Sequence, residues 1–459
     1  MKPTLAAALL DELRALLGER VTTAQALRDR HGQDESYHAP CPPDAVVYPH
    51  STEEVVGIVQ LCARHRTPMI AYGVGTSLEG NIAALHGGVC LDMGQMNRVL
   101  EVNPDDMDVR VQAGVTRKQL NAHIRDTGLF FPVDPGADAT IGGMTATRAS
   151  GTTTVRYGSM RDNVLGLTAV LADGRVIRTG TRARKSAAGY DLTRLLVGSE
   201  GTLAVITEIA LRLYGVPQSI TSAVCPFATL AGAVDTVIQT IQSGIPVARI
   251  ELLDEVQMKG VNLYSKFGYP EQPTLFFEFH GTAASAAEQA QTVGGIAREH
   301  GGTEFRWAAR QEDRSRLWQA RHDVLYAGLA LRPGSKALVS DVCVPISQLA
   351  RCILETRKDI DASGLIVPIV GHVGDGNFHM LILVDPDNAA EIERAWALNE
   401  RTVKRALALG GTCTGEHGVG YGKIDFVAAE HGAAVAVMRE VKRALDPENL
   451  LNPGKIFRE

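Results

Sequence analysis

Three glycine-rich patches constrain the fold of this chain more strongly than any other feature of its sequence. The patches span residues 72–80, 134–158 and 198–206, and small residues crowd each of them. Glycine lets the backbone adopt conformations that are closed to other residues, and it lets another group approach closely. Three such patches in the first half of the chain predict a surface on which one long ligand lies across all three.

The first patch, Tyr72-Gly-Val-Gly-Thr-Ser-Leu-Glu-Gly80, follows a short predicted strand over residues 68–71. Backbone N–H groups in such a loop form a nest for anionic oxygens, and Thr76 and Ser77 add donors. A dinucleotide pyrophosphate suits this nest. Leucine at position 78 departs from the G-x-G-x-x-G fingerprint, and the chain lacks the Gly-Lys-Ser/Thr of a P-loop. Taken alone, the patch also fits an ordinary turn.

Residues 45–215 alternate short strand-like apolar runs with helices. The N-terminal residues 1–30 are predicted to form an amphipathic helix, because leucines recur there at helical spacing. Asp173-Gly174 separates two strand-like runs as a hairpin turn. Further helices are predicted over residues 53–65 and 117–127, and strands over residues 68–71, 88–91, 108–112, 165–171, 176–177 and 203–213.

The pattern changes around Gly215-Val-Pro217, which indicates a domain boundary. Residues 218–390 read as strand–helix–strand units, typical of an antiparallel sheet with helices on one face. The sequence therefore predicts an α+β fold. The strands of this second part are predicted over residues 221–226, 248–253, 274–280 and 304–308, and the helices over residues 230–243, 283–300, 390–410 and 426–445.

Composition narrows the class of protein. A chain of 459 residues holds two or three domains, and a net charge of −6 argues against nucleic-acid binding. The seven cysteines include no C-x-x-C pair, which argues against a disulfide framework, a zinc ribbon and an iron–sulfur cluster. No apolar run reaches the roughly 18 residues of a membrane span. We expect a cytoplasmic protein, with peripheral association at the inner membrane left open.

A histidine motif stands out in the second half of the chain. Gly371-His-Val-Gly-Asp-Gly-Asn-Phe-His379 reads as two strands meeting at a glycine-rich turn. A hairpin centred there would place His372 directly opposite His379, with Cβ atoms about 4.5–5.5 Å apart. Glu416, in Gly415-Glu-His-Gly418, could complete a 2-His-1-carboxylate metal site. The alternative is a pair of structural histidines in a turn.

Taken together, the motifs resemble a known family. Gly-Val-Gly-Thr-Ser, Asp-Pro-Gly-Ala-Asp-Ala-Thr-Ile-Gly-Gly, Gly-Ser-Glu-Gly-Thr and Leu-Asn-Pro-Gly-Lys follow in the order typical of vanillyl-alcohol-oxidase-type FAD flavoproteins. The histidine and Gly-Glu-His-Gly motifs narrow the resemblance to the D-2-hydroxyacid dehydrogenase branch, of which the FAD-dependent D-lactate dehydrogenase (cytochrome) type is most similar. The resemblance covers about residues 40–457.

The resemblance implies a two-subdomain PCMH-type FAD-binding domain over residues 1–216, with its core at about 40–216. A substrate domain follows over residues 217–410, and residues 411–459 return to the FAD domain. It implies non-covalent FAD, held at the pyrophosphate by Gly73, Val74, Gly75, Thr76, Ser77 and Gly80; along the ribityl chain and flavin by Pro135, Gly136, Thr140, Ile141, Gly142, Gly143, Ala146 and Gly151; near the adenine by Glu200, Gly201 and Ile206; and near the isoalloxazine by Asn452. For any single glycine, an ordinary turn is the alternative.

The resemblance also implies a reaction. Oxidising a 2-hydroxyacid removes a hydride from Cα, which flavin accepts, and a proton from the hydroxyl. A divalent ion (zinc, manganese or iron) on His372, His379 and Glu416 would acidify that hydroxyl. His417 is the candidate general base, or else a residue that orients Glu416. Arg321 is the candidate for binding the substrate carboxylate, or else a surface salt-bridge residue, and Arg148 is a second candidate.

The substrate and electron acceptor remain partly open. Relatives that oxidise 2-hydroxyglutarate place a lysine shortly before the position of Asp341. Here Ala337-Leu-Val-Ser340 precedes it, although Lys336 is close. A small monocarboxylate such as D-lactate is therefore favoured. The missing Rossmann fingerprint argues against NAD, so a cytochrome, a quinone or an electron-transfer flavoprotein is expected as acceptor. A homodimer is compatible with the sequence.

Several rival functions differ in what they predict. A glycolate oxidase FAD subunit would need partner subunits with iron–sulfur clusters. A D-2-hydroxyglutarate dehydrogenase would need a second cationic side chain for its substrate. A metal-dependent hydrolase would be colourless and would leave the glycine patches unexplained. A lipid-modifying flavoenzyme of the alkyl-for-acyl exchange type would need an apolar channel, and a non-catalytic binding module would leave His417 without a role.

Overall fold

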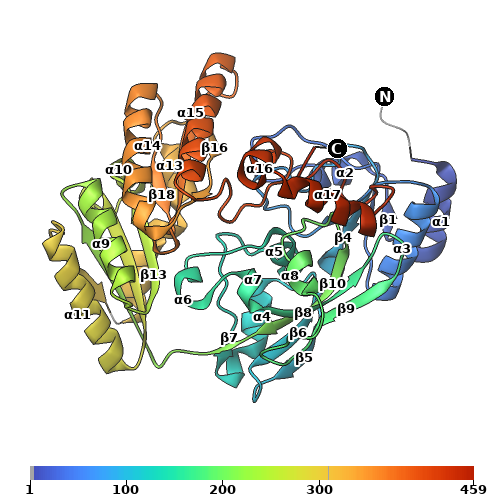
Figure 1. The fold of residues 1–459 in the computed structure, drawn as a ribbon, viewed down its shortest axis with the longest axis horizontal. Coiled ribbons are helices and arrows are strands. Elements are labelled where there is room, and N and C mark those ends of the chain that lie inside the picture. The colour runs from blue at the N-terminus through green and yellow to red at the C-terminus, as the bar shows by residue number, and fades with distance from the viewer. Residues whose placement is uncertain (1–4, 309, 459) are drawn as a thin grey trace. The chain divides into compact units, whose positions relative to one another are not determined.

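The computed structural model describes residues 5–308 and 310–458 (Figure 1). The chain forms two compact units. Unit 1 comprises the residues up to Ser150, Gly158–Val216 and the tail from Glu416 onward; unit 2 comprises Gly151–Tyr157 and Pro217–Gly415. None of the helices among the described residues is both long and apolar enough to cross a membrane.

Unit 1 contains a small sheet in the order β1-β2-β4-β3, in which β2, β4 and β3 are parallel. The helix α3 begins after Ser51, whose side chain accepts the Glu54 N–H, and it buries one apolar stripe. The elements of this part are α1 (Ala7–Leu17), β1 (Val21–Thr22), α2 (Gln25–His31), β2 (Ala45–Val47), α3 (Thr52–Arg64), β3 (Met69–Tyr72) and β4 (Val89–Asp92).

A second sheet of unit 1 is antiparallel, in the order β5-β6-β10-β8-β9. One apolar core includes residues of α1, of α3 and of both sheets, so the two parts share their packing. The strands are β5 (Val99–Asn103), β6 (Asp108–Gln112), β7 (Leu129–Phe130), β8 (Val164–Val170), β9 (Val176–Gly180), β10 (Val205–Arg212) and β11 (Tyr214–Gly215); the helices are α4 (Arg117–Ile124), α5 (Ile141–Thr147), α7 (Met160–Asn163), α8 (Leu192–Leu196), α16 (Ile424–His431) and α17 (Ala434–Leu445).

Unit 2 is built on an antiparallel sheet in the order β15-β12-β14-β13-β18-β19-β16, with β17 also paired to β19. The strands are β12 (Ser219–Pro226), β13 (Val247–Leu253), β14 (Thr274–Gly281), β15 (Arg306–Ala308), β16 (Lys336–Val339), β17 (Val342–Cys343), β18 (Ile369–Gly371) and β19 (Asn377–Val384); the helices are α6 (Thr154–Tyr157), α9 (Leu230–Gln242), α10 (Glu255–Ser265), α11 (Ala283–Glu299), α12 (Gln311–His322), α13 (Val324–Ala330), α14 (Leu349–Ser363) and α15 (Ala389–Ala408).

Helices pack on both faces of the unit 2 sheet, so the expectation of one covered face was wrong. In Figure 1, α9 and α11 lie side by side, and α11 contacts the strands β12 and β14. Phe276 points the other way from Phe277, because successive strand side chains alternate. Phe276 belongs to a core cluster with Trp318 of α12 and Met258 of α10. Glu251 pairs with Phe276 on the neighbouring strand, so its side chain lies on that same face.

Three further expectations need correction. The N-terminal residues form two helices with β1 between them, rather than one helix over residues 1–30. The helix predicted over residues 426–445 is interrupted at Gly432, whose φ of +52° ends α16. The chain rejoins unit 1 at Glu416 rather than at residue 411, because Thr412 still pairs with Cys343 and Thr414 donates to Asp341 within unit 2.

Candidate active site

Unit 1 brings the three glycine-rich patches and the C-terminal tail together. A Cβ on Gly73 would lie 2.4 Å from Thr140 Oγ1, so the first patch touches the second. The Glu200 N–H donates to the Ala146 carbonyl at 2.8 Å, which joins the third patch to the second. The Asn452 N–H donates to the Met69 carbonyl at 2.8 Å, which places the tail beside the strand before the first patch.

The glycines of the second patch have different roles. A Cβ on Gly142 would lie 2.7 Å from the Ala113 Cβ, so this glycine allows α5 to approach the end of β6. A Cβ on Gly136 would meet no atom within 4 Å, and one on Gly143 would meet only Thr140 Oγ1. Gly142 is therefore a packing residue, whereas the backbone at Gly136 and Gly143 is open to a ligand. Ile141 and Ile206 are buried in the apolar core.

The first patch also contacts the C-terminal part of the chain. The Ser77 hydroxyl donates to Asp34 at 3.0 Å, so an acidic side chain engages one of the donors assigned to a pyrophosphate. Gly80 has a φ of +69°, and a Cβ there would lie 2.2 Å from the Tyr421 ring. Val74 is 43% exposed, whereas Glu79 at the end of the loop is buried. The loop therefore combines an open backbone with a buried carboxylate.

Glu200 is the centre of a buried hydrogen-bond network. Its carboxylate accepts the Val419 N–H at 2.7 Å, the Gly420 N–H at 2.8 Å and the Asn81 amide at 2.6 Å. Asn452 donates to the Glu200 carbonyl at 2.7 Å. Burial raises the pKa of the Glu200 carboxyl above its usual value, although these donors oppose the rise. The side chain predicted to lie near the adenine thus secures the backbone that follows His417.

His372 and His379 lie close together in unit 2, but not as directly opposed strand residues. The register pairs Val370 with His379, and His372 follows the end of β18 as the residue before a short 3-10 turn. Chain reversal through that turn moves the partner of His379 by two residues, from His372 to Val370, so the expected opposition was wrong. The two imidazole rings nevertheless have centroids 5.6 Å apart and planes at 85°.

Each of these histidines has an oxygen partner at Nδ1. His372 Nδ1 lies 2.7 Å from Glu251 Oε1, and His379 Nδ1 lies 3.0 Å from the Ser340 carbonyl oxygen. Such partners fix the tautomer with the proton on Nδ1 and turn Nε2 toward a metal ion. Asn377, on the same strand as His379, donates to Asp341 at 2.8 Å. Oxygen partners at Nδ1 are also found on metal-binding histidines.

Arg321 extends from α12 to the same carboxylate. Its Nε lies 2.5 Å from Glu251 Oε2, and its side chain is only 13% exposed, so Arg321 makes a salt bridge that is buried rather than at the surface. Burial opposes ionisation of Glu251, but His372 and Arg321 together hold the pKa of this carboxyl below its usual value. Arg148, the second candidate, instead donates to the Val197 carbonyl at 3.1 Å. Burial lowers the pKa of Arg148.

Glu416 and His417 begin the last segment of unit 1. The Ser150 hydroxyl donates to Glu416 Oε2 at 2.7 Å. His417 Nδ1 lies 3.3 Å from Glu79 Oε1, and Lys423 Nζ lies 2.9 Å from the same oxygen. Gly151, predicted with the flavin contacts, begins the segment that belongs to unit 2.

Sequence reasoning missed the two carboxylates, Glu251 and Glu79, that hold site residues. A signal was present in one case, because Glu251 interrupts the apolar run of β13 between Ile250 and Leu252. A charged residue inside a buried strand needs a partner. No comparable signal marked Glu79, which stands in a loop where the local sequence indicates only anion binding.

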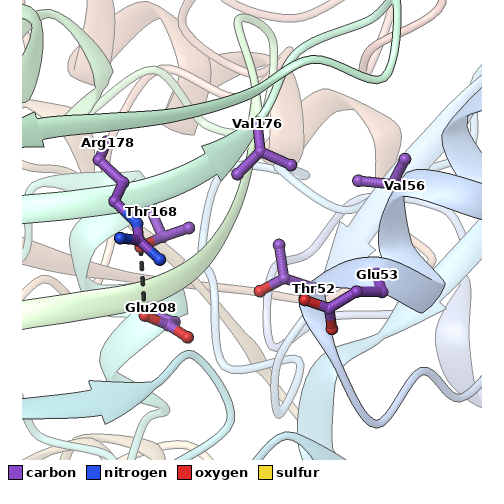
Figure 2. A pocket seen from close by; sticks show the side chains of 7 residues that line it. All are labelled: Thr52, Glu53, Val56, Thr168, Val176, Arg178 and Glu208. Carbon is purple, nitrogen blue, oxygen red and sulfur yellow. Dashed lines mark hydrogen bonds between the residues drawn. The ribbon is translucent and has the colours of Figure 1, made fainter.

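A hollow of 380 Å³ in unit 1 contributes nothing to this site. Figure 2 shows its lining, with a hydrogen bond of 3.2 Å from Thr168 to Glu208. Arg110 also pairs with Glu208 at 3.2 Å, so the acidic group there is already balanced. The hollow is lined by Thr52, Glu53, Val56, Thr168, Val176, Arg178 and Glu208.

Comparison with known proteins assigns the family. Residues 216–456 match the family model described as FAD linked oxidases, C-terminal domain, and residues 43–180 match the FAD binding domain. The chain belongs to the FAD-linked oxidase family. This oxidase is 52% identical over 454 residues to the "Probable D-lactate dehydrogenase, mitochondrial" of Danio rerio, an alignment that covers 98% of the chain and 91% of the relative.

Two further comparisons agree with this assignment. The "D-lactate dehydrogenase [cytochrome], mitochondrial" of Arabidopsis thaliana is 48% identical over 452 residues, covering 98% of this oxidase and 80% of the relative. The structure of 4-ethylphenol oxidase from Gulosibacter chungangensis superposes with a TM-score of 0.80 at 20% identity, covering 98% of this chain and 97% of that one. This second likeness shows the fold alone, and it confirms the expected PCMH-type architecture.

The family assignment confirms FAD as the cofactor, and the open backbone at Gly136 and Gly143 suits a flavin ligand. The oxidase is therefore an FAD-dependent oxidoreductase. This result excludes the metal-dependent hydrolase and the non-catalytic binding module.

Proposed function

We propose that this FAD-linked oxidase oxidises D-lactate to pyruvate and passes the electrons to a cytochrome. The observation that carries the proposal is the near full-length similarity to relatives named D-lactate dehydrogenase, the second of which names a cytochrome. When bound, FAD supplies the acceptor for the hydride that leaves Cα. The chain must bind the carboxylate, hold Cα in place and accept the hydroxyl proton.

Arg321 binds the substrate carboxylate in this proposal. Glu251 engages its Nε, and that contact sets the orientation of the planar guanidinium. The two terminal nitrogens then provide parallel donors, which is the geometry that suits a carboxylate. Lys336 is exposed and stands at the start of β16, while Ser340 stands directly before Asp341 and offers its carbonyl to His379. This arrangement favours a small monocarboxylate over 2-hydroxyglutarate or another dicarboxylate.

His372, His379 and Glu416 are proposed to hold one divalent metal ion. Imidazole and carboxylate ligands suit zinc, manganese and iron. The Nδ1 partners of both histidines support the proposal, as does the Ser150 hydroxyl that orients Glu416. A bound ion would act as a Lewis acid toward the substrate hydroxyl. His417, next to Glu416 in the chain, is proposed to accept the proton from that hydroxyl.

An anaerobic absorbance titration tests the substrate and its stereochemistry. D-lactate should bleach the flavin band of the purified holoenzyme, whereas L-lactate should leave it unchanged. Bleaching by neither isomer would reject D-lactate and point to another hydroxyacid. Under the same conditions, reduction of a cytochrome after D-lactate addition tests the electron acceptor. Rapid reduction of a quinone without reduction of the cytochrome would identify a quinone as the acceptor.

Two substitutions test the metal and the base separately. His372→Ala should lower metal content and activity together, and full activity without metal would reject the Lewis-acid role. His417→Ala should keep FAD and metal bound but slow flavin reduction by about 10²–10⁴-fold, the usual contribution of a general base. Normal flavin reduction in that variant would assign the base to another residue.

A further inference from the structure

We propose that Glu79 is a positioning residue that holds His417 in the tautomer needed for proton transfer. The inference rests on the proposed role of His417 and extends it to a loop whose sequence indicates only anion binding. Glu79 Oε1 lies 3.3 Å from His417 Nδ1, although the two residues are separated by 338 positions in the chain. Both side chains are buried, with 6% of the Glu79 side chain and 8% of the His417 side chain exposed.

The segment after His417 wraps around Glu79. The Glu79 carbonyl accepts the Tyr421 N–H at 3.0 Å and the Gly422 N–H at 3.1 Å. Gly420 has a φ of +51°, and a Cβ there would lie 1.9 Å from the Glu79 carbonyl oxygen. A Cβ on Gly422 would lie 2.9 Å from Glu79 Oε2. The glycines of this segment therefore let the backbone close around one carboxylate.

A positively charged side chain neutralises the Glu79 carboxylate and leaves the contact between Glu79 and the imidazole in place. Lys423 Nζ lies 2.9 Å from Glu79 Oε1, and the Lys423 side chain is only 4% exposed. Glu79 is thus a buried anion shared between an ammonium group and an imidazole. Buried charges are tolerated when they are paired in this way.

The chemistry follows from which ring nitrogen meets the carboxylate. An ionised carboxylate only accepts hydrogen bonds, so the His417 nitrogen that faces it carries the proton. In neutral imidazole the other nitrogen, Nε2, then carries the lone pair that takes the substrate proton. A carboxylate that orients a catalytic histidine in the Ser-His-Asp triads of hydrolases acts by the same logic. Glu79 touches neither substrate nor flavin in this role, and it acts through His417.

The test reads the tautomer directly. The holoenzyme is labelled with ¹⁵N-histidine, and the His417 resonances are assigned by their loss in His417→Ala. At a pH where the ring is neutral, the unmodified enzyme should show the proton on Nδ1. Glu79→Gln, which can turn an amide N–H toward the ring, should shift the population to the Nε2–H form and slow flavin reduction by at least about 10²-fold with little change in KM.

Glu200→Gln is the matched control for loop structure. Glu200 binds the backbone N–H groups of Val419 and Gly420 and not the imidazole, so this variant should leave the His417 tautomer unchanged. A double-mutant cycle then separates the two roles of Glu79. In the His417→Ala background, Glu79→Gln should cause no further loss of flavin reduction rate, because its effect passes through the missing imidazole.

Three results would overturn the inference. These are a proton on Nε2 in the unmodified enzyme, an unchanged tautomer in Glu79→Gln, or an equal loss of rate from Glu79→Gln with and without His417. The first of these needs no substitution at Glu79, so it decides the matter even if Glu79→Gln fails to fold. Normal flavin reduction in His417→Ala would instead reject the proposed base, while the tautomer measurement would still report on Glu79.

Discussion

Glu251→Gln should weaken both the folding of unit 2 and the proposed metal binding by His372. Glu251 is fully buried, and its two oxygens separately bind His372 at 2.7 Å and Arg321 at 2.5 Å. Glutamine keeps the shape but removes the charge, and its amide N–H₂ must face one of the two donors. Breaking a buried ion pair costs about 3–5 kcal/mol. Because Arg321 retains some exposure to water, we expect about 3 kcal/mol.

The measurements are the free energy of unfolding of unit 2 within the whole enzyme and the affinity for the metal. Loss of a residue that orients a metal-binding histidine weakens metal binding by about 10–100-fold. Denaturant unfolding and metal analysis at controlled free metal would give both quantities. Glu288→Gln is the control, because Glu288 is an exposed glutamate on α11 in the same unit. Stability within about 0.5 kcal/mol of this control, together with unchanged metal affinity, would refute the reasoning.

Two further predictions concern stability. Burial raises the pKa of Asp254, at the start of α10, to about 7, although the Gln257 and Ile369 N–H groups oppose the rise. The native state therefore binds this proton more tightly than the unfolded state, so the stability that Asp254 contributes should be present near pH 4 and lost as the pH rises through about 7. The free energy of unfolding of Asp254→Asn, measured in parallel, should lack this loss. Identical pH dependences of the two proteins would contradict the prediction. Gly420→Ala should lower the melting temperature more than Gly432→Ala. Both glycines have a φ near +50°, but only a Cβ on Gly420 would meet backbone, at 1.9 Å from the Glu79 carbonyl oxygen. Equal losses of melting temperature would mean that the positive φ alone sets the cost.

The cofactor class and most of the regular elements could be predicted from the sequence. Local signals sufficed there, because hydrophobic periodicity identifies helices and strands and glycine marks backbone that must approach another group. The strand Asp108–Gln112 was predicted with its exact bounds. The histidine pair was also recognisable, because both members lie in one short motif. Its register was wrong by two residues, since a 3-10 turn replaces the expected tight hairpin.

Only the tertiary structure identified the carboxylates that hold the site. Glu251 meets His372 across 121 positions of the chain, and Glu79 meets His417 across 338. No local pattern encodes such pairs, because these charged and polar groups interact strongly only after the fold brings them together and excludes water around them. The sequence by itself determined which chemical groups are available and which cofactor the glycine patches suit. The packing of distant segments decided which ring nitrogen each carboxylate engages, because a hydrogen bond requires contact within about 3 Å.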